Sequence, residues 1–224
     1  MKALYLVFLF FVFFSCQKSE DMPLDHGYDY QPLQQGFRWT YELAETICFG
    51  ENDCESDSFF LRDSVAQSYK SENKLDIFVI VRKKSTDRRI WEIDSQYTLH
   101  VDQGKLLRRM ENEFIVPLIF PPNENRRWDG NLYSTSQEEI FEILKEKNYR
   151  VGQLNFSEVL KVLHEDFDDK ITSRDIRFEV FAKNIGMVES FHERFSYCSR
   201  NDCLGEQRIE SGRLTHIKLL SYDQ

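Results

Sequence analysis

The sequence lacks the short motifs that mark common catalytic and nucleotide-binding sites. It contains no G-x-S-x-G segment, no P-loop, no G-x-G-x-x-G run and no H-E-x-x-H pair. Its five histidines, at positions 26, 100, 164, 192 and 216, never fall at H-x-H or H-x3-H spacing, so no zinc hydrolase site is indicated. We expect each histidine at the surface or at a strand edge. The sequence therefore predicts a non-enzymatic protein with no cofactor and no metal, although scattered carboxylates leave a glycosidase neither supported nor excluded.

Clusters of basic side chains are missing as well. The chain has 29 Lys and Arg against 38 Asp and Glu, a formal net charge of −9, and no basic run is longer than Arg82-Lys83-Lys84, the others being pairs such as Arg88-Arg89. Phosphate backbones and anionic lipid surfaces repel a chain of this charge. We therefore expect no nucleic-acid partner.

Long apolar runs are absent except at the N-terminus. Ala3 to Phe14 form twelve uncharged residues after Lys2, and Ser15 and Cys16 follow. At a helical rise of about 1.5 Å per residue this run covers roughly 18 Å, less than the roughly 30 Å of a hydrocarbon core. Residues 13–16 resemble a lipobox, with Phe13 and Phe14 where the pattern prefers leucine and a small residue. The sequence predicts a signal peptide at 1–15 and lipidation of Cys16.

The segment after the cysteine bears on location. Residues 16–30 are polar and charged, which is typical of a flexible tether between the lipid anchor and the folded domain. Gln17 stands where the best-known inner-membrane retention signal has Asp, which favours the outer membrane. Residues 18–21, K-S-E-D, resemble a short signal for export to the cell surface. The cell surface and the periplasmic leaflet both stay open, and the membrane itself is the first expected partner, through the lipid anchor.

The other four cysteines form two local pairs. Cys48 and Cys54 bracket one turn-forming segment, and Cys198 and Cys203 bracket another. An exported protein folds in an oxidising compartment, and the C-x2-C spacing of a zinc site is missing. We therefore expect the disulfides Cys48–Cys54 and Cys198–Cys203, each stiffening an exposed hairpin tip.

Alternation of apolar and polar residues dominates the remaining pattern. Residues 37–43 alternate strictly, and 75–81, 97–101, 114–120, 176–182 and 187–197 repeat the pattern. Turns are expected at Asp102 to Lys105 and at Glu210 to Arg213, each joining an antiparallel hairpin. Segment 138–167 contains good helix formers, so one short helix is an alternative to the strands favoured there. We predict an all-β domain at 31–224, with about ten antiparallel strands in a strongly curved sheet, either a partly open barrel or a sandwich.

Several short motifs resemble a group of uncharacterised bacterial outer-membrane lipoproteins. They are the lipobox cysteine, the pattern P-L-x-x-G-x-x-W-x-Y at 32–41, W-x-G-N at 128–131 and F-A-K-N-I-G-M-V at 181–188. The resemblance implies that 156–164 is a strand. It implies no catalytic residues.

Two tryptophans are candidates for ligand contact. Trp39 and Tyr41 lie on an alternating strand and are expected in the core, whereas Trp91 and Trp128 lie near loops where a ring could stack on a sugar. The acidic segment 164–169 lacks the spacing of a calcium loop, so we expect a solvated turn there.

Three functions stay open on this sequence. We favour a non-enzymatic, lipid-anchored envelope protein that binds another envelope component. The alternatives are a carrier that holds a hydrophobic or lipid ligand in the curved sheet, and a glycan-binding or glycan-degrading accessory. A carrier requires a cavity of about 300 to 1,000 Å³, whereas a packed centre would exclude it.

Overall fold

The described part of the chain is built almost entirely of strands. The computed structural model describes residues 25–51 and 53–223, so the expected signal peptide at 1–15, the lipidation site Cys16 and most of the tether lie outside the described residues. Within the described ranges there is one 3-10 turn, η1 (Tyr28–Tyr30), followed by twelve strands in a single antiparallel sheet. None of the described residues forms a helix long and apolar enough to cross a membrane.

The strands vary widely in length, from three residues to eighteen. They are β1 (Arg38–Gly50), β2 (Asp53–Lys70), β3 (Asp76–Ser85), β4 (Glu92–Asp102), β5 (Lys105–Met110), β6 (Glu113–Ile119), β7 (Arg127–Asp129), β8 (Ile140–Val151), β9 (Leu154–Asp168), β10 (Ser173–Ala182), β11 (Gly186–Tyr197) and β12 (Ile209–Asp223).

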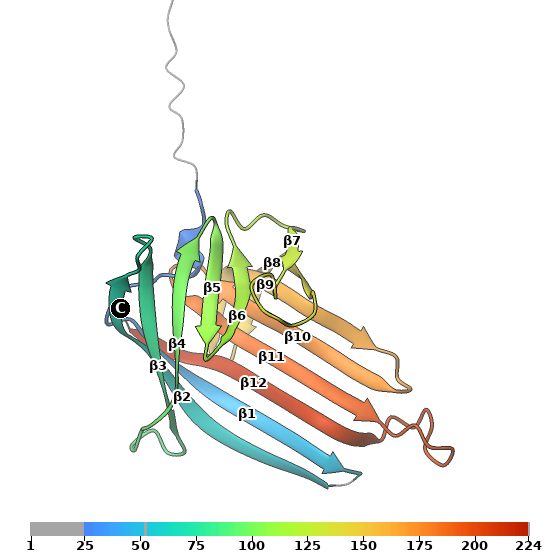
Figure 1. Cartoon of the computed structure of the whole chain (residues 1–224). Helices are drawn as coiled ribbons and strands as arrows, with labels where there is room; N and C mark the ends of the chain where they lie inside the picture. The colour runs from blue at the N-terminus through green and yellow to red at the C-terminus, as the bar shows by residue number, and fades with distance from the viewer. Residues whose placement is uncertain (1–24, 52, 224) are drawn as a thin grey trace, which may run out of the picture.

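The sheet curves until its two edges meet. Its strand order is β6-β5-β4-β3-β2-β1-β12-β11-β10-β9-β8-β7, so β1 and β12 pair in the middle and β6 and β7 form the edges (Figure 1). The backbone N–H of Val116 on β6 donates to the carbonyl of Gly130, just after β7, at 2.8 Å. The indole Nε1 of Trp128 donates to the carbonyl of Val116 at 2.7 Å. These contacts make the sheet a nearly closed barrel, as the curved-sheet prediction requires.

Side-chain alternation explains why the concave face became the core. On β1 the side chains of Trp39, Tyr41 and Leu43 are buried, while Thr40 and Glu42 between them are half-buried and exposed, respectively. Successive strand residues point to opposite faces, so one strand supplies three buried side chains to the interior. The all-β prediction is confirmed, with twelve strands instead of about ten.

Two local expectations have clear outcomes. Residues 138–167 form β8 and β9, so the strand reading holds and the helix alternative is wrong. The turn expected at 210–213 is also wrong, because these residues lie inside the continuous strand β12. Gly212 is there for close packing: a Cβ on it would lie 2.1 Å from the carbonyl oxygen of Arg194. Glycine in a strand therefore marked a close approach of backbones instead of a chain reversal.

Packing against the barrel begins before residue 31. Tyr30 is buried, and the backbone N–H of Asn184 donates to the carbonyl of Asp29 at 2.6 Å. The Lys183 ammonium lies 2.9 Å from a carboxylate oxygen of Asp25 and 3.3 Å from one of Asp29. The end of the expected tether, up to residue 30, is thus attached to the loop between β10 and β11.

Candidate functional site: the barrel interior

The barrel encloses a cavity of about 310 Å³, which we call the apolar cavity. Aromatic and aliphatic side chains from both halves of the sheet make up most of its wall. They include Trp39, Tyr41, Tyr97, Leu99, Leu106, Phe114, Ile115, Phe181, Met187 and Ile217. The volume lies at the small end of the range of ligand sites. The centre of this barrel is therefore only partly filled by its own side chains.

The two aromatic residues of β1 are fixed by hydrogen bonds. The Nε1 of Trp39 donates to the carbonyl of Ile185, and the hydroxyl of Tyr41 donates to the carbonyl of Met187 at 3.1 Å. These bonds satisfy the polar atoms of two buried rings, which would otherwise lose hydrogen bonds to water. One wall of the apolar cavity is thereby held rigid.

A buried charged cluster lies beside these two rings, on the neighbouring strands β2, β3 and β4, with Asp63 the cross-strand neighbour of Trp39. Arg82 donates two hydrogen bonds to the carboxylate of Asp63, at 2.8 Å and 2.7 Å, and the hydroxyl of Tyr97 donates to the same carboxylate at 2.9 Å. Burial and the Asp63 charge raise the pKa of Tyr97. Burial disfavours the charge on Arg82, but Asp63 outweighs it and raises the pKa of Arg82. This cluster is internally satisfied, so its role is to hold strands β2, β3 and β4 together.

The second buried ion pair is less completely satisfied. Arg108 on β5 lies 2.7 Å from Oε1 of Glu179 on β10, so the pair crosses the interior. Burial opposes ionisation of Glu179, but Arg108 outweighs it and lowers the pKa of this carboxyl. The other carboxylate oxygen, Oε2, is buried and has no hydrogen-bond partner in the described structure. A charged acceptor is therefore left available at the cavity wall.

A larger hollow of about 1060 Å³, which we call the polar cavity, lies on the same concave face. Its wall is formed by polar and charged side chains, chiefly from β9, β10, β11, β12 and the segment before β8. They include Arg127, Gln137, Glu138, Glu139, His164, Glu165, Arg177, His192, Arg194, Arg213 and Thr215. Asn131 and Ser136 line both cavities, so the two hollows share a wall.

Two histidines lie at this shared region, contrary to the expectation that all histidines are at the surface or at strand edges. His164 is only 4% exposed, and its ring stacks on Phe141 with centroids 3.8 Å apart. The ring of His192 meets that of His164 edge-on at 5.7 Å. Burial lowers the pKa of His164 to about 3 and also lowers the pKa of His192. Both imidazoles are therefore neutral at physiological pH.

The buried position of His164 was not expected from the sequence, because residues 164–169 are mostly acidic. On β9 the buried side chains Leu160, Val162 and His164 alternate with the more exposed Lys161 and Leu163. Extending the alternation by one step would have placed His164 on the interior face. The solvated turn expected from 164 onward therefore begins too early, because β9 continues to Asp168.

The two candidate tryptophans lie apart and are used structurally. The Arg62 guanidinium lies over the ring of Trp91, 3.9 Å from its centroid. Trp128 bonds to Val116 and meets the ring of Phe141 edge-on at 5.9 Å. Neither residue lines either cavity.

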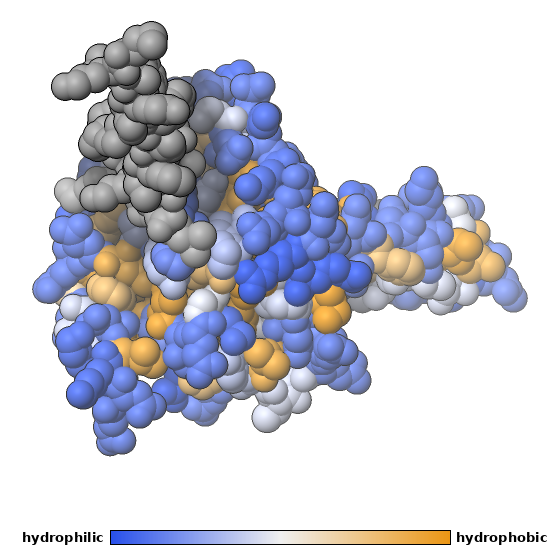
Figure 2. Space-filling model, turned by 90° about the horizontal axis from the view of Figure 1, so that it is seen from above, coloured by the Kyte–Doolittle hydropathy of each residue, from blue (hydrophilic) through white to orange (hydrophobic). Residues whose placement is uncertain are grey.

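The cysteines line neither cavity and belong to a projecting arm. Disulfides join Cys48 to Cys54 and Cys198 to Cys203, the pairing expected from their spacing. The arm is formed by the β1–β2 turn and the β11–β12 loop, the latter reaching well beyond the barrel, and hydrophobic surface shows along it (Figures 1 and 2).

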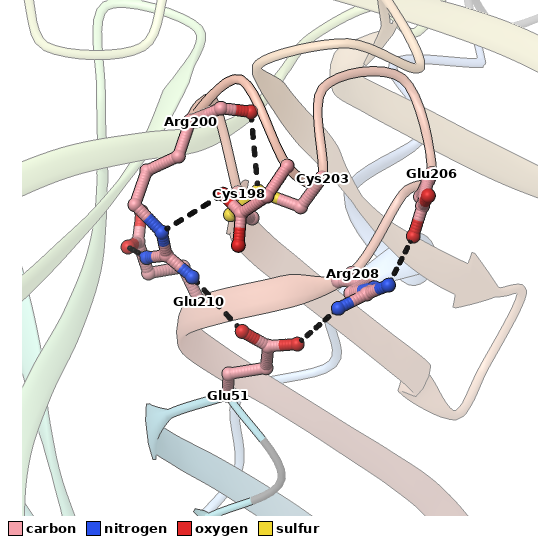
Figure 3. Close-up of a disulfide and its surroundings, with 8 residues drawn as sticks. Glu51, Cys198, Arg200, Cys203, Glu206, Arg208 and Glu210 are labelled. Carbon is pink, nitrogen blue, oxygen red and sulfur yellow. Dashed lines mark hydrogen bonds and ion pairs between the residues drawn. A yellow bond between two sulfur atoms is a disulfide. The ribbon is translucent and has the colours of Figure 1, made fainter.

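Ion pairs join the two disulfide-closed loops. The Glu51 carboxylate lies 2.9 Å from Arg200 and 2.8 Å from Arg208, so the β1–β2 turn is attached to the β11–β12 loop (Figure 3). Among the described residues the one group of three potential metal ligands is Cys198, Asp202 and Cys203. Its two sulfurs are bonded to each other and so are not available as thiolates.

Comparison with known proteins gives distant structural likenesses only. No protein-family model matches the chain, and no characterised protein matches its sequence. A protein from Bacteroides fragilis, described as exported and as having a YmcC-like fold, is 14% identical, with a TM-score of 0.44 over 87% of this chain and 98% of its own. A protein from Parabacteroides distasonis, described as a lipoprotein, is 9% identical, with a TM-score of 0.40 over the same shares. Likenesses of this size assign no function.

Proposed function

We propose that this protein is a lipid-anchored protein of the bacterial outer membrane that carries a small hydrophobic or amphipathic ligand inside its barrel. The anchor is Cys16, and the leaflet is either periplasmic or cell-surface. The observation that carries the ligand-binding part is the apolar cavity, about 310 Å³ of space within a rigid aromatic wall. Protein interiors are otherwise close-packed, so unfilled apolar space of this size is expected where a ligand fits.

The walls of the apolar cavity suit an alkyl or acyl chain. Removing apolar surface from water contributes about 25 cal/mol per Å², and a chain in this cavity would contact the rings and aliphatic groups that make up most of its wall. The hydrogen bonds of Trp39 and Tyr41 keep these rings in place before a ligand arrives. A preorganised wall lowers the entropic cost of binding.

Binding can be measured with a neutral fluorescent probe, 1-N-phenylnaphthylamine, and the chain from Gln17 onward. This form keeps every described residue and therefore the whole core. We expect saturable binding of one probe per chain. Ser190 is buried and lines the apolar cavity, so Ser190→Phe should fill it and abolish binding, whereas Ser58→Phe on the exposed part of β2 should not. Equal binding by the two variants would contradict a carrier function.

A second function, docking to another envelope component, is favoured by the projecting arm. Phe49 is 64% exposed and Leu204 is 56% exposed, and each lies next to a disulfide. Exposed apolar side chains on a stiff projection are typical of a protein contact. If the arm docks, replacing both Phe49 and Leu204 with serine should release a partner that co-purifies with the acylated protein. The matched control is Ile93→Ser, since Ile93 is 73% exposed on β4, away from the arm. Loss of the partner in the control as well would exclude the arm.

A further inference from the structure

The two cavities meet at a group of buried polar atoms that the barrel itself does not use. Nε2 of His164, Nε2 of His192 and Oε2 of Glu179 are all buried and have no hydrogen-bond partner in the parts of the chain that are described. Glu179 lines the apolar cavity, and the two histidines line the polar one. Glu179 also interacts electrostatically with both imidazoles, so the three groups are neighbours. Buried polar atoms normally have hydrogen-bond partners. Three neighbouring buried atoms without a partner therefore indicate a site where a ligand could supply the missing hydrogen bonds.

The arginines of the polar cavity, in contrast, already have partners. Each arginine that lines it forms an ion pair with a carboxylate of the protein. The pairs are Arg127 with Glu142, Arg177 with Asp175 and Glu139, Arg194 with Asp175, and Arg213 with Glu45. An anionic ligand would have to compete with these carboxylates, and the lining residues Glu138 and Glu165 add further negative charge.

The unused hydrogen-bonding capacity therefore belongs to two neutral rings and one carboxylate oxygen. A neutral imidazole offers one donor and one acceptor, and an ionised carboxylate accepts only. Hydroxyl groups both donate and accept, so they can satisfy all three atoms without adding charge. An ammonium group could satisfy Glu179, but it offers no acceptor to an imidazole N–H and would be buried beside Arg108, which pairs with Glu179.

We infer that the polar cavity binds the head of the ligand whose chain lies in the apolar cavity, and that this head is uncharged and rich in hydroxyl groups. The ligand class is thus a neutral glycolipid or a similar polyol amphiphile. This inference rests on the proposed carrier function, because it requires a chain in the apolar cavity. His164, His192 and Glu179 bind the head at the junction of the two cavities.

The test compares ligands that share one chain and differ in the head. The probes are octyl β-glucoside, octyl sulfate, octyltrimethylammonium and octanol, each titrated calorimetrically into the chain from Gln17 onward. The three surfactants are kept below their micelle concentrations, and octanol is kept below its solubility limit. We expect the glucoside to bind at least about tenfold more tightly than each of the other three. If octanol binds as tightly as the glucoside, or if either charged probe binds as tightly or more tightly, the inference is overturned while the carrier function stands. If no octyl compound binds, the carrier function fails with it.

A substitution in the polar cavity tests whether the head group of the ligand binds there. His192 lines only the polar cavity, so His192→Phe should weaken octyl glucoside binding about tenfold and leave octanol binding unchanged. Unchanged octanol binding also reports that the variant is folded. The matched control is His100→Phe, because His100 lines neither cavity, and it should bind both probes as the unaltered chain does. Equal glucoside affinities in the two variants would remove the polar cavity from the site.

Discussion

The buried imidazole of His164 should make the barrel sensitive to acid. Its pKa lies at about 3, against 6.5 for an unperturbed histidine, because burial disfavours the charged form. Above about pH 6.5 the ring is neutral in both the folded and the unfolded chain, and the free energy of unfolding is unaffected. As the pH falls below 6.5, His164 is protonated in the unfolded chain but stays neutral in the folded chain. Stability therefore decreases steadily until the folded pKa is reached.

The size of the effect follows from the pKa difference. Each pKa unit corresponds to about 1.4 kcal/mol, so lowering the pH from about 7 to about 4.5 should cost about 2.5 kcal/mol through this group alone. His164→Gln removes the titration while keeping a polar side chain, so the variant should lose about 2.5 kcal/mol less over this interval. Urea unfolding at the two pH values, followed by tryptophan fluorescence, measures both changes.

A matched substitution separates this effect from general acid denaturation. His26 is exposed, so His26→Gln should retain the full acid sensitivity of the unaltered chain. If His164→Gln loses as much stability between the two pH values as the unaltered chain does, then His164 is not buried in a neutral form. The arrangement at the junction of the cavities would then be wrong.

Three further outcomes are expected. Arg108→Met leaves the Glu179 carboxylate buried without its partner and should lower the free energy of unfolding by about 3 to 5 kcal/mol in urea titrations. Adding Glu179→Leu should recover part of this loss. If the losses of the two substitutions simply add, the pair does not contribute as described. A Cβ at Gly130 would lie 2.4 Å from the ring of Phe141, so Gly130→Val should destabilise the barrel closure by at least about 1 to 3 kcal/mol, and an unchanged urea midpoint would refute that contact. Cys16→Ser should abolish incorporation of labelled palmitate in cells, and persisting label would remove the lipid anchor.

The fold was predictable where one face of a strand is buried and the other is not. Residues 37–43 alternate without interruption, and the structure places them in β1 with alternate side chains buried. The pairing of the cysteines followed from their proximity in the sequence, from the turn-forming residues between them and from the missing spacing of a zinc site. Gly212 could not be placed correctly from the sequence, because a glycine in a turn and a glycine at a close strand contact look the same there.

The interior site was not predictable, because it depends on register between distant strands. Glu179 faces Arg108 across the interior from 71 positions away along the chain. His164 and His192 meet only because β9 and β11 flank β10. No local pattern specifies such contacts, although the alternation along β9 did contain the information that His164 points inward.

The carrier function is tested most directly by measuring whether the protein isolated from its own membrane holds a ligand. Acylated protein purified from membranes can be released from detergent and weighed by native mass spectrometry. The account predicts an added mass of one small amphiphile per chain, absent from the Ser190→Phe variant, whose apolar cavity is filled. Identical masses for the two proteins, each corrected for the substitution, would contradict a ligand in the apolar cavity.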